Sequence, residues 1–110
     1  MITVHSAKNI QDGVQNLIDA SIQDYKQFNN NNDMQKDFEN SWEVKEGQKY
    51  IKIIRKNSVH AFIVKKDFKH FKSGDVLKPA SWAAPALNQP RGNVLEGNYP
   101  MQWTGPLYLN

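Results

Sequence analysis

The pattern of apolar residues changes near residue 41, and this change constrains the fold more than any other feature of the sequence. Before it, apolar side chains recur three or four positions apart, which places them on one stripe of a helix. After it come two runs rich in β-branched residues, 50–56 and 59–65, joined by the turn signal Asn57-Ser58. Such a pair predicts an antiparallel hairpin. The sequence therefore predicts an α+β fold, with N-terminal helices packed on a small antiparallel sheet.

The first expected helix covers residues 7–28, with Ser6 as its N-cap. Its apolar stripe consists of Ala7, Ile10, Val14, Leu17, Ser21, Tyr25 and Phe28. Gly13 lies inside this helix and is expected to cost about 1 kcal/mol relative to alanine. After a run of four asparagines, Asp33 is expected to cap a second helix that ends near Asn40. We expect the stripe to pack on the protein's own sheet; pairing of two copies through it, or docking on another protein, are the alternatives.

Residues 79–110 contain every proline of the chain, interleaved with aromatic residues. Proline removes amide donors and excludes long regular elements, whereas the aromatic content is too high for disorder. We expect an ordered proline- and aromatic-rich C-terminal wrap, with short strands near 93–95, 101–103 and 107–109. Before the wrap, Phe68 and Phe71 suit one helical turn, and Val76-Leu77 follows a Gly-Asp turn.

The 110 residues are expected to form one domain, because the chain shows no internal repeat and no linker. A helical acidic part, 1–40, precedes a strand-rich basic part, 41–110. Residues 1–49 carry five lysines against eight acidic residues, whereas residues 50–91 carry nine basic residues against two acidic ones. This asymmetry indicates two faces with different partners, or an acidic part that docks on a basic one.

Catalytic and metal-binding motifs are not found in the sequence. The absence of cysteine excludes disulfides and thiolate metal sites. His5, His60 and His70 do not follow metal-ligand spacing, and Ser81 lacks the Gly-x-Ser-x-Gly context of a hydrolase nucleophile. We therefore expect a binding protein and not an enzyme, with no cofactor and no metal.

The basic residues supply a candidate surface for anions or nucleic acid. Its members are Arg55, Lys56, Lys65, Lys66, Lys69, Lys78, Arg91 and Trp103. Alternate side chains of a strand point to opposite faces, so these residues cannot form one stripe. A patch for phosphates could form where the first five gather near strand ends and the following turn. The alternative, which we favour, is that the lysines solvate the outer face of the sheet and protect its edge against aggregation.

Aromatic residues of the wrap could stack on bases while Lys78 and Arg91 hold phosphates, or could close a pocket for a nucleotide or other small anion. They are Trp82, Tyr99, Trp103 and Tyr108. The alternative is that they pin the wrap to the sheet. Trp82 is expected in the core and Trp103 at the surface. Arg91 beside Gly92 suits a guanidinium aimed at a phosphate or carboxylate, or one that ties the wrap to a backbone carbonyl.

One stretch of the chain carries a family resemblance. Val59-His-Ala-Phe-Ile-Val-Lys-Lys66 is followed by Lys72-Ser-Gly-Asp-Val-Leu-Lys-Pro-Ala-Ser-Trp-Ala-Ala-Pro-Ala86 and by Arg91-Gly-Asn93. Residues 50–95 thereby resemble a family of small proteins encoded by tailed bacteriophages. That family has no established activity, so the resemblance implies a viral origin and assigns no role to any residue.

Small phage proteins of this kind often act on the host, and the resemblance therefore implies an accessory protein that binds and modulates a host protein, in host takeover or anti-defence. The expected location is the cytoplasm of the infected bacterial cell, because the opening residues lack a signal peptide and no apolar run could span a membrane. The alternative function is binding of nucleic acid or a nucleotide by the basic C-terminal part. A homodimer through the N-terminal helix is a further alternative.

Overall fold

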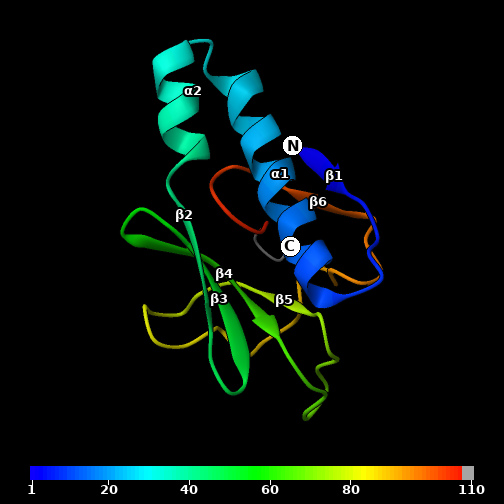
Figure 1. The fold of residues 1–110 in the computed structure, drawn as a ribbon. Coiled ribbons are helices and arrows are strands. Elements are labelled where there is room, and N and C mark those ends of the chain that lie inside the picture. The colour runs from blue at the N-terminus through cyan, green and yellow to red at the C-terminus, as the bar shows by residue number, and fades with distance from the viewer. Residues whose placement is uncertain (108–110) are drawn as a thin grey trace.

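The computed structural model describes residues 1–107 and contains two helices and six strands within them. In chain order these are β1 (Ile2–Val4), α1 (Ile10–Phe28), α2 (Asn32–Glu39), β2 (Trp42–Glu46), β3 (Tyr50–Arg55), β4 (Ser58–Val64), β5 (Val76–Leu77) and β6 (Tyr99–Met101). One antiparallel sheet has the order β2-β3-β4-β5, and a second joins β1 to β6. Helix α1 packs on the larger sheet beside the β1–β6 pair (Figure 1). The predicted α+β architecture is confirmed.

Both helices begin at asparagines that were not predicted as caps. Asn9 caps α1, and its side-chain oxygen accepts a hydrogen bond of 2.8 Å from the amide of Asp12. Asn31 caps α2 in the same way. The predicted caps, Ser6 and Asp33, are wrong because Ser6 lies in the connection after β1 and Asp33 lies inside α2. Asparagine is as good an N-cap as serine or aspartate, so the residue type alone does not locate the first turn.

The apolar stripe of α1 is buried within the chain. Its residues share one core with β1, β3, β4 and β6, formed by Val4, Val14, Leu17, Ile18, Ile53, Ala61, Ile63, Tyr99 and Met101 among others. The expectation that the stripe packs on its own sheet is confirmed. Phe28, at the end of α1, stays 66% exposed. Apart from Phe28, the stripe residues of α1 are thus buried or partly buried within the chain.

Gly13 lies where α1 comes closest to the C-terminal wrap. A Cβ atom there would lie 2.6 Å from Cβ and 2.7 Å from the carbonyl oxygen of Val94. Val94 is fully buried. Glycine at this position destabilises the helix relative to alanine, but it allows the helix to approach the backbone of the wrap.

Three expectations for the second half of the chain are wrong in detail. Phe68 and Phe71 form no helical turn; they exchange two backbone hydrogen bonds in a tight antiparallel bridge. Residues 93–95 enter a turn, since the side-chain oxygen of Asn93 accepts from the amide of Leu95. The strand expected at 101–103 begins two residues earlier, as β6. The strand expected at 107–109, and Tyr108 with it, extends outside the described residues.

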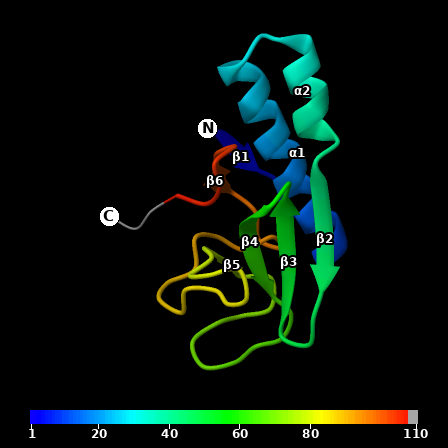
Figure 2. The same cartoon turned by 90° about the vertical axis from the view of Figure 1, so that its left-hand side faces the viewer.

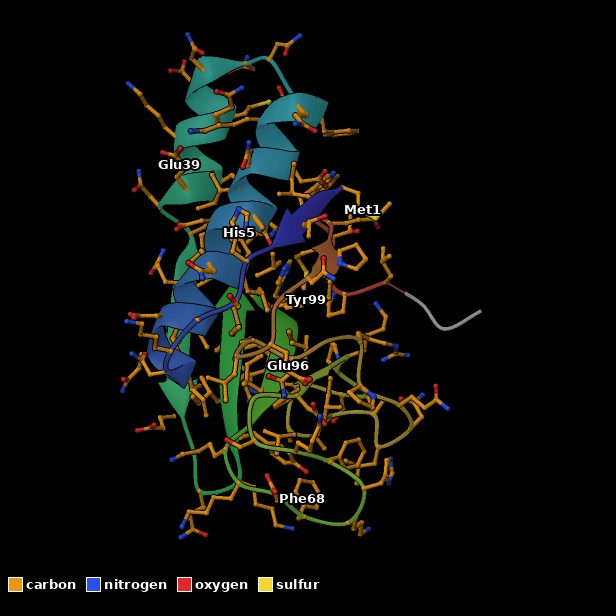
Figure 3. All side chains as sticks on the ribbon, turned by 90° about the vertical axis from the view of Figure 1, so that its right-hand side faces the viewer. Met1, His5, Glu39, Phe68, Glu96 and Tyr99 are labelled. Atoms are coloured by element: carbon orange, nitrogen blue, oxygen red, sulfur yellow. The ribbon has the colours of Figure 1, made fainter. Side chains whose placement is uncertain are left out.

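The turn after residue 93 is held against the segment that joins β1 to α1. The amide of Asn98 donates to the carbonyl of Val4 at 2.7 Å, and the amide of Ala7 donates to the carbonyl of Leu95 at 3.1 Å. His5, Glu96 and Tyr99 accordingly lie along one side of the molecule (Figure 3). Within residues 1–107, no helix is both long enough and apolar enough to cross a membrane.

Candidate anion-binding pocket

The hairpin separates the basic residues that were expected to gather. Antiparallel pairing of β3 with β4 places Arg55 and Lys56 at the turn that joins the two strands. Lys65, Lys66 and Lys69 follow the opposite end of β4. The two groups are thus about 20 Å apart, the length of a six-residue strand. The expected patch of these five residues does not form.

Several of these cations already have partners within the chain. The guanidinium carbon of Arg55 lies 4.9 Å from the ring centre of Phe38. Lys56 forms a 2.8 Å ion pair with Asp37. Lys65 reaches a carboxylate of β2 at 3.4 Å and a backbone carbonyl of the β2–β3 turn at 2.9 Å. These contacts favour the alternative interpretation, in which the lysines of the hairpin form its solvated surface.

The two tryptophans of the wrap differ from their expected environments, Trp82 fully and Trp103 in part. Trp82 is 50% exposed, with the ammonium of Lys52 4.7 Å from its ring centre. Trp103 is half-buried; its ring centre lies 4.9 Å from that of Phe28, and its amide donates to Asp24 at 2.9 Å. The expectation for Trp82 is therefore wrong, whereas Trp103 lies at the surface only in part. The helical hairpin of α1 and α2 extends beyond the sheet and supplies aromatic surface to Trp103, which the local sequence around Trp103 could not indicate.

Lys78 and Arg91 are the two predicted cations that the structure brings into one pocket. Lys78 directly follows β5, and the amide of Arg91 donates to the carbonyl of Val76 in β5 at 2.8 Å. The loop between them thus leaves and returns beside the same strand. The pocket has a volume of about 450 Å³ and is lined by Val59, His60, Lys78, Pro79, Ala86, Asn88, Arg91 and Thr104.

The guanidinium of Arg91 lacks the partners that a buried charge normally has. Its Nε and Nη1 atoms are buried and reach no acceptor among residues 1–107, so the expected tie between these atoms and a backbone carbonyl is not found there. Burial and the neighbouring Arg91 lower the pKa of Lys78, whose ammonium donates to the carbonyl of Pro106 at 2.6 Å. Among residues 1–107, the side chains that line the pocket include no carboxylate. A cationic pocket results, and an anion that enters it would offset the desolvation of the guanidinium.

His60 forms the inner wall of this pocket and is fully buried, not half-buried as its alternation with Phe62 suggested. The hydroxyl of Ser21 donates to the carbonyl of Leu17 at 3.0 Å and lies 2.9 Å from Nε2 of His60. Because that hydroxyl proton is already used, the imidazole donates from Nε2. Burial, with Arg55 and Lys78 nearby, lowers the pKa of His60 to about 3. The imidazole is therefore neutral and contributes no charge to the pocket near neutral pH.

The lining has the chemistry of an oxyanion receptor. A guanidinium presents its donors in a planar fork that matches a phosphate or carboxylate, and an ammonium adds a second, compact charge. Asn88 and Thr104 add neutral polar groups at the exposed rim. No group of three or more potential metal ligands occurs in the described part of the chain.

A family model places the whole chain in one family. The model of a family of unknown function, DUF7717, matches residues 3–109. The chain belongs to this family. The match includes the two helices as well as the stretch of 50–95 on which the phage resemblance rests, and the phage origin itself stays a prediction. No curated protein and no solved structure shows a significant match, so function has to be argued from the pocket.

Proposed function

We propose that the protein binds a small ligand through a phosphate or carboxylate group in the pocket formed by Lys78 and Arg91. The observation that supports this function is the guanidinium of Arg91, which has two buried nitrogens without an acceptor in a pocket whose described lining holds no carboxylate. A buried donor without an acceptor costs free energy. An oxyanion in the pocket would supply the counter-charge that its described lining lacks.

The distribution of charge favours a compact anion over a nucleic-acid strand. A strand needs a continuous series of cations and aromatic stacking surfaces. Here the remaining predicted cations lie at the two ends of the hairpin. Among the described residues, His60 supplies the one ring in the pocket lining apart from Pro79, and no tryptophan, tyrosine or phenylalanine belongs to that lining. If the ligand is a nucleotide, the pocket would therefore recognise a single anionic group of it.

Titration calorimetry at low salt with inorganic phosphate, citrate and adenosine monophosphate tests this function. We expect at least one of the three to bind wild type and the Arg91→Gln variant to bind it about 10 to 100 times more weakly, the equivalent of losing one charge-assisted hydrogen bond. Arg55→Gln is the matched control, because it removes the same charge outside the pocket lining. Absence of binding by wild type at millimolar concentrations, or equal losses in the two variants, would contradict the proposed site.

A second proposed function is that of a phage accessory protein that binds a host protein, and an exposed aromatic groove favours it. The groove, of about 490 Å³, lies between α1, α2 and Trp103. Phe28 and Met34 at its rim are 66% and 49% exposed. Large apolar side chains that stay exposed around a groove are typical of protein-binding surfaces.

Affinity capture from bacterial lysate, followed by titration with the purified partner, tests the second function. We expect a partner that binds wild type and Arg91→Gln equally, because Arg91 lies outside the groove. The double variant Phe28→Ser with Met34→Ser should bind at least tenfold more weakly. Undiminished binding by the double variant would exclude the aromatic groove as the interface.

A further inference from the structure

Strand β2 is the terminal strand of the larger sheet, and its outer edge is open. Within residues 1–107 the sheet order is β2-β3-β4-β5, so β2 pairs there with β3 on one side only. Glu43, Val44, Lys45 and Glu46 are all exposed, and Val44 is 48% exposed despite being apolar. Figure 2 shows β2 at the margin of the molecule, with no other strand beyond it. An open edge of this kind can pair with another strand.

The hydrogen bonds at the two ends of β2 show which of its residues face outward. At one end of β2 the amide of Gly47 donates to the backbone carbonyl of Tyr50. At the other end the amide of Lys56 donates to the backbone carbonyl of Ser41. In an antiparallel ladder, bonded and non-bonded pairs alternate. The odd-numbered residues of β2 therefore direct their backbone groups to β3. Trp42, Val44 and Glu46 direct theirs to the open edge.

We propose that two copies of the chain pair antiparallel through this edge, centred on Val44, to form one continuous sheet. In that register Val44 faces Val44 of the second copy, and Trp42 faces Glu46. Both are hydrogen-bonded pairs, because these are the residues whose amides and carbonyls point outward. Glu43 then faces Lys45 of the second copy at a non-hydrogen-bonded pair, where side chains approach most closely.

The charged side chains of β2 complement a second copy of the same strand better than they complement the facing residues of β3. Within one chain Lys45 lies opposite Lys52, and Glu43 lies opposite the apolar Ile54. The pair that Lys45 and Glu43 form with each other is long, at 3.8 Å, and exposed. Charged side chains on an edge strand normally prevent pairing. Self-pairing reverses this effect, since the dimer contains two Glu43–Lys45 pairs, one on either side of the two-fold axis.

An apolar surface continues from the edge toward α1. A groove of about 270 Å³ runs between α1 and β2 and is lined by Gln11, Val14, Gln15, Ile18, Val44, Glu46 and Ile51. Val44 therefore belongs both to the open edge and to this groove. Pairing through β2 would bury Val44 against its copy, which adds apolar burial to the backbone hydrogen bonds. The interface is separate from the cationic pocket and does not depend on ligand binding there.

Charge reversal provides a test whose result only this register predicts. Glu43→Lys places lysine opposite lysine across the axis, and Lys45→Glu places glutamate opposite glutamate. We expect wild type to show a concentration-dependent monomer–dimer equilibrium by sedimentation, and each single variant to dimerise at least tenfold more weakly. An equimolar mixture of the two variants should recover dimerisation, because every lysine then faces a glutamate of the other chain.

The mixture also serves as the control for folding, since only folded chains can form the mixed dimer. The double variant with both charges reversed, E43K with K45E, should dimerise like wild type. A wild-type chain that stays monomeric up to millimolar concentration would overturn the self-pairing and leave the edge to a strand of another protein. A dimer that is insensitive to both single reversals would place the interface elsewhere and overturn it as well.

Discussion

The free energy of unfolding is expected to fall by about 2 kcal/mol between pH 7 and pH 5, because the folded protein holds His60 neutral. Burial, with Arg55 and Lys78 as nearby cations, lowers the pKa of His60 from 6.5 to about 3. The unfolded chain takes up this proton near pH 6.5 and therefore binds more protons than the folded chain below that pH. The contribution of neutral His60 to the free energy of unfolding is fully present above pH 6.5 and decreases as the pH falls toward 3. Urea denaturation at several pH values measures the loss.

Two histidine variants test whether His60 is responsible for the loss of stability between pH 7 and pH 5. His60→Gln keeps an amide donor for the hydroxyl of Ser21 and cannot titrate, so its stability should be nearly constant between pH 7 and pH 5. His5→Gln, at an exposed position, should retain the wild-type slope. Carboxylates titrate mainly below this window. A wild-type slope in His60→Gln would assign the acid sensitivity to another group.

The local spacing of apolar and β-branched residues was sufficient to predict the main helices and strands. The features that were not predicted depend on contacts between residues far apart in the sequence. The stripe of α1 and the two β-branched runs each specify their element through residues that are neighbours in the chain. Strand β1 has three residues and exists because Ile2 pairs with Met101 at the other end of the sequence. The exposure of Trp103 likewise depends on its contact with the helical hairpin, and Trp82 contacts Lys52 of β3; neither contact lies within a window around the tryptophan.

The two cations of the candidate site were predicted together from the sequence, whereas His60, Asn88 and Thr104 of its lining were not. Lys78 and Arg91 were identified from the sequence, and β5 brings them together because the chain leaves and re-joins that strand. Lys65 was grouped with Arg55 because both flank the hairpin, yet antiparallel strands place them at opposite ends. The open edge of β2 was not predicted as a binding surface, since the order of strands in a sheet is a tertiary property.

Replacement of Gly97 by alanine is expected to cost about 3 to 5 kcal/mol of stability, enough to unfold much of a chain of ordinary stability. Gly97 has a φ of +68°, in the left-handed region that residues with a Cβ atom avoid. The added Cβ would also lie 2.2 Å from the amide nitrogen of Ser6 and 2.5 Å from the carbonyl carbon of His5. Because both are backbone atoms, no side-chain rotation can relieve the overlap. Urea denaturation of the variant measures the loss.

Relief of that overlap requires the turn at 93–98 to move away from the segment after β1. The hydrogen bonds from Asn98 to Val4 and from Ala7 to Leu95 would then break, and the pairing of β1 with β6 would weaken. Gly47→Ala is the matched control: its Cβ would meet one atom, the carbonyl oxygen of Tyr50 at 3.3 Å, without a positive φ, and we expect a loss below about 1 kcal/mol. Equal stability of the two variants would show that the turn does not dock on the N-terminal segment, and that the β1–β6 sheet contributes little to holding the wrap in place.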